Sequence, residues 1–237
     1  MGQKSNAYRL MSHRYLESSF SAKSVDYSNS VVESQKIREY FDRQSRKLGW
    51  KIVQVQIIKF ADKIQIEISS LAPGIVTGKK GSNLERINKD LKKIVTPAHH
   101  FEVFVCGVSC PETNAQAIAI KFAQDLRARK SPSFSMKRYL FDAMTYGAKG
   151  ILIQLKGRIG GREIARTMRE SLGSVPRQNI RMSQFIDYCQ YDVETASGVC
   201  GLKVLVNNYK APGEQVIEKR PTMKYTKPRQ NYRQNSL

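Results

Sequence analysis

The 237-residue sequence contains few of the residues from which catalytic and metal sites are built. Its four cysteines, at positions 106, 110, 189 and 200, lack the paired C-x-x-C spacing of a zinc site. His13, His99 and His100 have no identifiable ligand or nucleophile partner, and the acidic residues form no paired-carboxylate pattern. No G-x-x-x-x-G-K-[ST] nucleotide loop is present. We therefore expect reduced thiols, no metal, no cofactor and no enzymatic activity.

Acidic charge and long apolar runs are also scarce. There are 20 Asp and Glu against 40 Lys and Arg, which gives a net charge of +20 and a pI near 9.9. This balance is typical of proteins that bind a polyanion such as RNA. A membrane partner is disfavoured because no apolar segment is long enough to span a bilayer and the N-terminus lacks an apolar signal core. The excess of charge is spread over both halves of the chain, so we expect both to contact the polyanion.

The segment 73–85, PGIVTGKKGSNLE, predicts a basic turn that leads into a helix. It contains the G-x-x-G motif Gly78, Lys79, Lys80 and Gly81. Glycine lets a backbone lie against a sugar-phosphate strand without a Cβ in the way. Ser82 and Glu85 have the spacing of a capping box, so free N–H groups, the helix dipole and both lysines are expected to face one anion. The alternative is an ordinary turn before an amphipathic helix.

The residues around this turn have the periodicity of a small α+β domain. Alternating apolar residues predict strands at 53–57, 64–68 and 101–105, the first two antiparallel and joined by a turn at Ala61-Asp62. Helical spacing predicts helices at 31–48, 84–94 and 115–126. The order helix, strand, strand, G-x-x-G, helix, strand resembles a type II KH domain, whose loop clamps about four nucleotides by their backbone.

A second domain is expected after a break in composition at Ser131-Pro-Ser133. Apolar spacing predicts a helix at 136–144 and strands at 151–155, 185–191 and 202–206. If the chain is helical from Gly161 onward, Arg162, Arg166 and Arg169 share one face. Seven basic residues against two acidic ones between positions 156 and 181 favour phosphate as the partner of that face. The alternative is a solvated face paired with Glu163 and Glu170.

These patterns divide the chain into five parts. We expect a basic N-terminal extension at 1–30, a type II KH domain at 31–128, a linker at 129–134, a second α+β domain with a mixed sheet at 135–213, and a basic tail at 214–237 without structure of its own.

Short motifs along nearly the whole chain carry a family resemblance. They are MGQK at 1–4, QKIR at 35–38, PGIV at 73–76, GKKG at 78–81, GAKG at 147–150, GRIGG at 157–161, EIART at 163–167, IDY at 186–188 and GVCGLKV at 198–204. With them the chain resembles the universal small-subunit ribosomal protein S-three family in its bacterial form. The resemblance implies a structural protein that binds ribosomal RNA in the head of the small subunit, lines the messenger entry channel, and has the S-ten and S-fourteen families as neighbours.

The motifs and the charge pattern together select the residues that should contact RNA. For ribosomal RNA these are Gly2, Gln3, Lys4, Gly78, Lys79, Lys80, Gly81, Arg158, Arg162, Arg166, Arg169, Arg177 and Arg181. The family resemblance implies that Lys137 and Arg138 contact messenger RNA at the entry channel. A free-standing KH regulator would share the G-x-x-G loop but would not need the motifs at 147–204. A nuclease would need a carboxylate cluster or a catalytic lysine, and none can be identified in the sequence.

Two departures from the family pattern bear on function. The family has two arginines where this chain has Ser133 and Phe134, which puts a contribution to messenger unwinding in question. The family's Gly-Arg-Val-Pro-Leu-His-Thr-Leu-Arg stretch appears here as GSVPRQNIR at 173–181. Such drift favours an organelle ribosome, mitochondrial in particular, with a divergent bacterium as the alternative. Since the MGQK start leaves no room for a transit peptide, we expect an organelle-encoded gene.

Overall fold

The computed structural model describes residues 18–20, 24–59, 63–94, 100–175 and 186–208. These residues form two compact units, and the chain passes from the first to the second between Gly107 and Val108. Each unit has one sheet and its own hydrophobic core. The chain is therefore α+β with two domains, as the sequence predicted.

The first unit has the element order predicted for a KH domain. Its elements are β1 (Ser18–Phe20), α2 (Ser24–Leu48), β2 (Ile52–Lys59), β3 (Lys63–Ser70), α3 (Pro73–Thr77), α4 (Ser82–Ile94) and β4 (His100–Gly107). The sheet order is β1-β2-β3-β4, with β2 and β3 antiparallel and β3 and β4 parallel. β1 pairs with β2 and α2 begins at Ser24, so structured residues start earlier than the expected boundary at 31. The turn predicted at Ala61-Asp62 lies outside the described residues.

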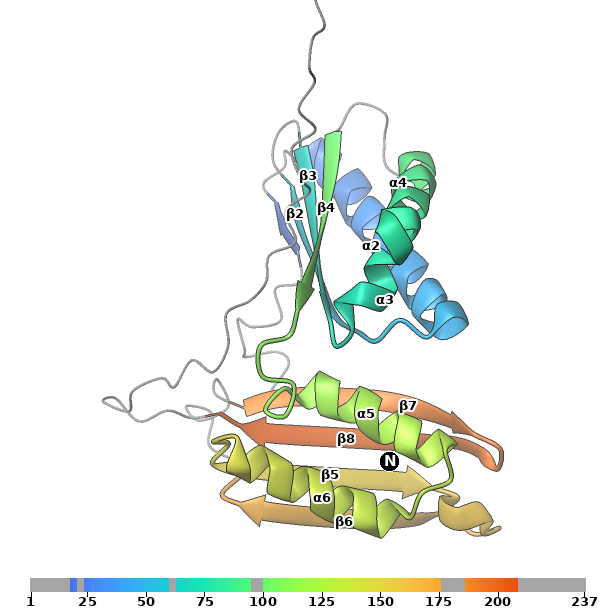
Figure 1. The fold of residues 1–237 in the computed structure, drawn as a ribbon, viewed down its shortest axis with the longest axis vertical. Coiled ribbons are helices and arrows are strands. Elements are labelled where there is room, and N and C mark those ends of the chain that lie inside the picture. Colours follow the sequence, from blue (N-terminus) through green and yellow to red (C-terminus); the bar gives the residue numbers. More distant parts are fainter. Residues whose placement is uncertain (1–17, 21–23, 60–62, 95–99, 176–185, 209–237) are drawn as a thin grey trace, which may run out of the picture. The chain divides into compact units, whose positions relative to one another are not determined.

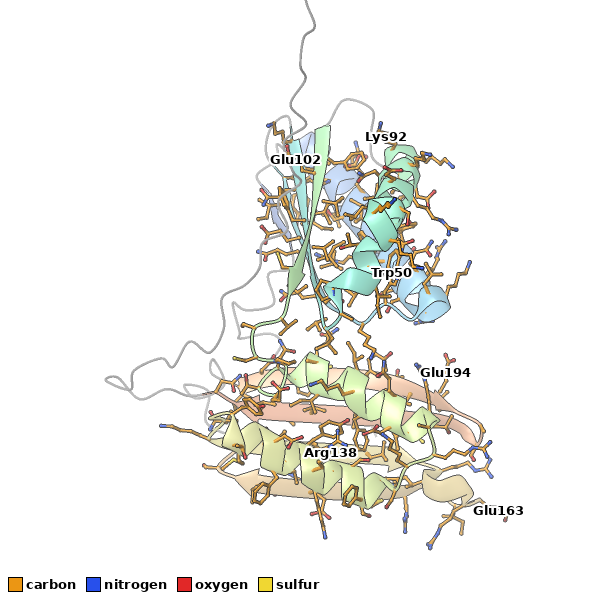
Figure 2. All side chains as sticks on the ribbon, in the orientation of Figure 1. Trp50, Lys92, Glu102, Arg138, Glu163 and Glu194 are labelled. Atoms are coloured by element: carbon orange, nitrogen blue, oxygen red, sulfur yellow. The ribbon has the colours of Figure 1, made fainter. Side chains whose placement is uncertain are left out.

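The core of the first unit lies between the sheet and its helices, which cover one face of it (Figure 1). The alternation in β3 places Ile64, Ile66 and Ile68 on this face, all fully buried. Trp50, labelled in Figure 2, is also buried in this core. Apolar residues at helical spacing on α2 and α4 complete the core, which positions the turn between α3 and α4.

A hydrogen bond joins the two long helices of this unit. The Tyr40 hydroxyl on α2 donates to Oδ2 of Asp90 on α4 at 3.0 Å. Burial, followed by the hydrogen bond to Asp90, raises the pKa of Tyr40 to about 12. Tyr40 therefore stays a neutral donor throughout the physiological range, and it fixes α4 against α2.

The second unit is a four-stranded sheet with two helices on one face (Figure 1). Its elements are α5 (Ala115–Arg127), α6 (Pro132–Thr145), β5 (Gly150–Gly157), β6 (Arg166–Gly173), β7 (Ile186–Thr195) and β8 (Gly198–Asn207). The order is β6-β5-β8-β7, and every pairing among the described residues is antiparallel. The expectation of a mixed sheet here was wrong. Neighbouring strands β7 and β8 are joined by a two-residue turn, a connection that only antiparallel strands can make.

The helix α5 belongs to the second unit, and its assignment to the KH domain was wrong. Its apolar face packs in the core of the antiparallel sheet. Asn114 caps the helix by accepting from the N–H groups of Gln116 and Ala117, and the Ala115 N–H donates to Oδ2 of Asp187 on β7 at 2.8 Å. A carboxylate at a helix N-terminus also complements the helix dipole. Residues 128–131 therefore join two helices of one core and are not an interdomain linker.

A buried carboxylate holds α5 and α6 together. Asp125 on α5 accepts from the Tyr139 hydroxyl on α6 and from Nζ of Lys130, both at 2.7 Å. Burial acts to raise the pKa of Asp125, but the hydrogen bonds from Lys130 and Tyr139 and the nearby positive charges outweigh it and hold this pKa below its usual value. The same contact, together with burial, raises the pKa of Tyr139.

We expect Asp125→Asn to lower the free energy of unfolding by about 1–3 kcal/mol at pH 7, because two charge-assisted hydrogen bonds lose their anionic acceptor. A carboxylate with a depressed folded-state pKa adds stability above its unfolded pKa and loses it as the pH falls through the folded value. The deficit of the variant should therefore shrink below about pH 4. Urea titrations of the variant and the unmodified protein at pH 7 and below about pH 4 measure the difference in the free energy of unfolding. Asp142→Asn, which removes an exposed pair with Arg138, should cost less than about 1 kcal/mol. An equal Asp125→Asn deficit at both pH values would contradict the charge argument.

Candidate nucleic-acid interface

The G-x-x-G turn lies between α3 and α4, and its backbone explains its glycines. Gly78 ends α3 with φ 73° and ψ 175°, and Gly81 has φ 82°. A Cβ on Gly78 would lie 2.8 Å from the Asn83 side chain, so a larger residue would be strained in conformation and short of space. Lys80 also has a left-handed φ of 52°. The turn is therefore a defined conformation that places two consecutive lysines on the surface.

Hydrogen bonds brace this turn from both sides. The Gly78 N–H donates to the Gly74 carbonyl at 2.9 Å, and Nδ2 of Asn83 reaches back to the Ile75 carbonyl at 3.0 Å. The predicted capping box was wrong. An N-cap residue has an extended backbone, whereas Ser82 has helical φ and ψ of −55° and −38°. Ser82 is helical because the short 3-10 turn η2 (Lys79–Gly81) leads directly into α4. The lysines are positioned by the turn itself.

The cations at this turn are free to meet an external anion. Lys79 and Lys80 are exposed, and neither forms an ion pair with any residue that the structure describes. Arg86 and Lys89, on the first turns of α4, are exposed as well. A nucleic-acid strand that passes here would meet two lysine charges on a backbone that is already ordered. Because little backbone entropy is then lost on binding, the arrangement favours affinity.

A second rigid turn joins β5 to β6. Gly157 has φ 147°, and a Cβ there would lie 2.8 Å from Sγ of Cys200. Ile159 is buried in the core, and Arg158 clamps the turn by donating from Nε to the Arg162 carbonyl at 2.9 Å and from Nη1 to the Ser197 carbonyl at 3.2 Å. Arg158 is thus partly a structural residue, and Arg162 is presented at the surface by the turn it stabilises.

Arg162, Arg166 and Arg169 do not lie on a helix, so the predicted shared helical face was wrong. Residues from Arg166 form the edge strand β6, in which Arg166 is opposite Gly157 and Arg169 is opposite Gln154. Alternate residues of a strand point to opposite faces, so Arg166 and Arg169 lie on different faces of the sheet. Arg166 shares its face with Met168, which packs against the core under the helices. Arg169 is on the face that the helices leave uncovered.

These arginines are not neutralised by the nearby acids. Arg162, Arg166 and Arg169 are exposed, and within the described ranges none is paired with Glu163 or Glu170. The alternative prediction, in which Glu163 and Glu170 pair with these arginines, is therefore wrong for the described residues. Arg158, Arg162 and Arg166 cluster at one end of β5 and β6, where Figure 2 shows Glu163 projecting from the connecting turn.

The uncovered face of the second sheet contains a cation that the sequence analysis missed. Gln154 on β5 is opposite both Arg169 on β6 and Lys203 on β8. Arg169 and Lys203 are therefore two strands apart on one face, roughly 10 Å between their Cα atoms. Their proximity depends on pairing between strands distant in sequence, which no local spacing could have indicated.

The residues expected at the messenger channel lie on α6. Lys137 and Arg138 are both exposed. Nε of Arg138 is 3.8 Å from Oδ2 of Asp142, and its guanidinium lies 5.0 Å from the centre of the Tyr139 ring. Lys137 has no ion-pair partner in the part of the chain that the structure describes. Lys137 is thus the freer of the two cations.

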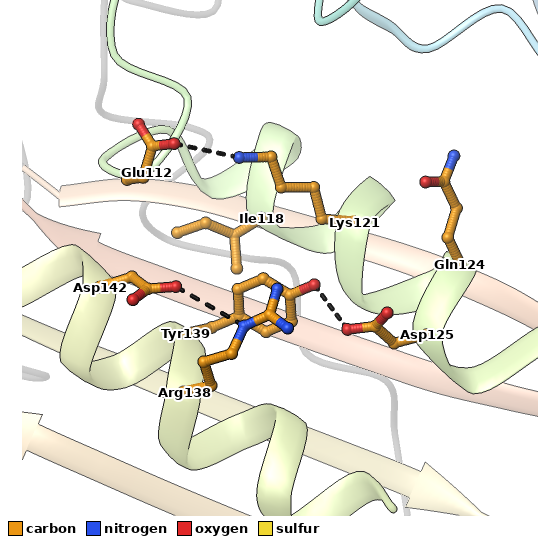
Figure 3. A pocket seen from close by; sticks show the side chains of 8 residues that line it. All are labelled: Glu112, Ile118, Lys121, Gln124, Asp125, Arg138, Tyr139 and Asp142. Carbon is orange, nitrogen blue, oxygen red and sulfur yellow. Dashed lines mark hydrogen bonds and ion pairs between the residues drawn. The ribbon is translucent and has the colours of Figure 1, made fainter. Parts of the chain in front are cut away.

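A cavity of about 360 Å³ lies between α5 and α6 (Figure 3). Its charged lining consists of Glu112, Lys121, Asp125, Arg138 and Asp142. Glu112 pairs with Lys121 at 3.2 Å, and the other charges pair as described above. Because these charged groups satisfy one another, the cavity is part of the contact between two helices and offers no unpaired charge to a ligand.

Several predicted features cannot be placed. Gly2, Gln3, Lys4, Arg177 and Arg181 lie outside the described residues, as does the tail at 214–237. All four cysteines are free thiols. Within the described ranges, no three metal-ligating side chains come together, and no helix has the length and apolarity to cross a membrane.

Comparison with known proteins matches both units. Residues 36–106 match the family described as "KH domain", and residues 122–206 match "Ribosomal protein S3, C-terminal domain". The protein named "Small ribosomal subunit protein uS3" from Pelagibacter ubique is 36% identical over 208 residues, which are 87% of this chain and 89% of that protein. The proteins of the same name from Rhodopirellula baltica and Desulforamulus reducens are 34% and 36% identical, and each match covers 87% of this chain and 88% or 91% of the relative.

Proposed function

This chain belongs to the uS3 family of small ribosomal subunit proteins, and from that membership we propose which of its surfaces hold RNA in the assembled particle. The chain is a structural, RNA-binding constituent of the small subunit and not an enzyme. A free-standing KH regulator would leave the match of residues 122–206 unexplained.

Ribosomal RNA is held at two separate basic turns. The first is the G-x-x-G turn with Lys79 and Lys80, and the second is the β5–β6 turn with Arg158, Arg162 and Arg166. The observation that carries this proposal is that each turn is held by left-handed glycines and by a hydrogen bond from a side chain to a backbone carbonyl, while its exposed lysines or arginines have no ion-pair partner among the described residues. A backbone held in this way loses little conformational entropy on binding a phosphate, and arginine can hold two phosphate oxygens at once.

The proposal also covers the residues that contact messenger RNA, the neighbouring proteins in the subunit and the compartment in which the ribosome works. Lys137 and Arg138 on α6 contact messenger RNA at the entry channel, and the neighbouring proteins in the head belong to the S-ten and S-fourteen families. Gly2, Gln3, Lys4, Arg169, Arg177 and Arg181 supply further contacts to ribosomal RNA. The departures at 133–134 and 173–181 support a mitochondrial ribosome.

Purified ribosomes test the subunit assignment directly. After a high-salt wash and separation of the subunits, quantitative mass spectrometry should recover the protein in the small subunit at one copy per particle. Phosphate contacts alone weaken steeply with salt, so basic proteins that are only adsorbed to the surface are removed by the wash. A protein enclosed by the RNA and proteins of the particle should remain. Preparing the ribosomes separately from mitochondria and from the cytoplasm tests the compartment. Recovery only in the soluble fraction contradicts the proposal.

A further inference from the structure

The exposed face of α6 has two large aromatic side chains that lie mostly in solvent. Phe134 is 69% exposed and Phe141 is 71% exposed, which makes them among the most exposed large apolar residues of the second unit. They are seven residues apart, so they lie on the same face of the helix, about 10 Å apart along its axis. The opposite face of α6 packs in the core through Met136, Tyr139 and Leu140.

The same face also contains the two cations of α6. Lys137 lies three residues after Phe134 and four before Phe141, and Arg138 lies four after Phe134. The face is therefore a row of ring, cation and ring. Asp142 is the acidic residue beside it, and Asp142 is already paired with Arg138. Lys137 is left as an unpaired charge between two exposed rings.

We propose that Phe134, Lys137 and Phe141 form a stacking platform for single-stranded RNA. A base stacks on each ring while the ammonium group of Lys137 contacts the phosphate backbone between them, a combination of aromatic platforms and positive charge that binds single strands without sequence preference. This inference rests on the proposed messenger contact at Lys137 and Arg138. In this proposal Phe134 contributes a stacking contact with RNA, whereas the sequence alone indicated only the loss of an arginine at this position.

The charge on this face favours RNA over a protein as its occupant. A protein that covered the two rings would have to bury Lys137 between them, and burying an unpaired ammonium group is costly. A single-stranded nucleic acid supplies phosphate for that ammonium group and flat bases for the rings. The net charge of +20 adds long-range attraction for the same partner.

Small subunits assembled with variant protein test the proposal. The variant Phe134→Leu with Phe141→Leu keeps the apolar character and removes the rings. We expect it to bind a short oligouridylate RNA at least about 5-fold more weakly than the unmodified protein, because stacking on aromatic side chains contributes to affinity at each base. The slope of log affinity against log salt should not change, since no phosphate contact is lost. Lys137→Ala should instead lower that slope by about 0.7.

Two controls separate stacking from general surface effects. Tyr146→Leu removes an aromatic ring that is 57% exposed just after α6 and off the proposed face, and it should leave RNA binding unchanged. Phe134→Trp with Phe141→Trp should keep or raise the affinity, because the π-faces remain.

Crosslinking of thiouridine-containing messenger to α6 distinguishes the possible failures. If the messenger crosslinks to α6 in unmodified subunits and the leucine variant binds normally, the stacking platform is wrong and the messenger contact stands. If no crosslink forms in unmodified subunits, the messenger contact fails and the platform fails with it. Loss of a neighbouring protein from leucine-variant subunits, with RNA binding unchanged, would identify a protein-docking face and also overturn the proposal.

Discussion

Cells in which the only copy of this protein has Arg162→Glu with Arg166→Glu should form small subunits that lack it. The two arginines are exposed at the β5–β6 end of the second sheet and are unpaired among the described residues. Each charge-assisted hydrogen bond to phosphate contributes about 1.5–3 kcal/mol, so losing two contacts should weaken RNA binding by roughly 100-fold or more. Charge reversal adds repulsion. Mass spectrometry of purified small subunits measures the incorporation.

The fold should not be affected, because both side chains are exposed and neither is part of the core. Arg158 is left unchanged in this variant since its hydrogen bonds to the Arg162 and Ser197 carbonyls hold the turn. Arg162→Lys with Arg166→Lys keeps the charge but removes the planar fork, so it should incorporate with reduced affinity. Normal incorporation of the glutamate variant would refute the β5–β6 anchor.

The second large effect is expected at the G-x-x-G turn. Lys79→Asp with Lys80→Asp should weaken binding of ribosomal RNA and lower the slope of log affinity against log salt by about 1.4 on single strands or 1.8 on duplex RNA, two phosphate contacts being lost. Aspartate tolerates the left-handed backbone at position 80 better than most residues, so the turn should keep its conformation. A filter-binding titration over a range of salt concentrations measures both quantities.

The matched control makes the same charge change at the other end of α4. Lys92 and Lys93 are exposed on the last turn, about 15 Å along the axis from the start of the helix. Figure 2 shows Lys92 at this end of α4. Lys92→Asp with Lys93→Asp alters the net charge equally and should change the slope much less, although it should cost up to about 1 kcal/mol per residue of stability at the helix C-terminus. Equal slopes for the two double variants would mean that the turn has no special role.

Local periodicity predicted the first unit well. The alternation of Ile64, Ile66 and Ile68 corresponds to a buried strand face, and the G-x-x-G motif to a left-handed turn, because each depends on residues close together in the chain. The errors arose where distant residues decide the structure. The helical stripe of α5 is real, but the sheet that it covers is chosen by contacts such as that of Ala115 with Asp187, which is 72 residues away.

The arginine cluster shows the limit of spacing as a signal. Offsets of 4 and 7 were taken from the arginines alone, whereas the apolar residues around them form no helical stripe, and pairing with β5 makes the segment a strand. Arg162 and Arg166 were nevertheless correctly predicted to be exposed, because a helix and a strand at this edge both leave them on the surface. Neither the neighbourhood of Arg169 and Lys203 nor the row of rings on α6 could be inferred before the sheet and core were known.

The position of α5 has a consequence for the order in which the chain acquires structure during its own synthesis. The sheet and helices described for the first unit are all present once Gly107 has left the exit tunnel, since none of its described core residues comes later. The second unit must wait much longer. One of its two central strands, β8, is also its last described strand, and the N-terminus of α5 is held by β7. The helices α5 and α6 therefore emerge well before the sheet that they cover is complete. Domains generally fold as units with the N-terminal one first. The nascent protein therefore has a finished KH unit followed by an interval in which two apolar helix faces are exposed, the period when it most needs a chaperone or a waiting RNA site.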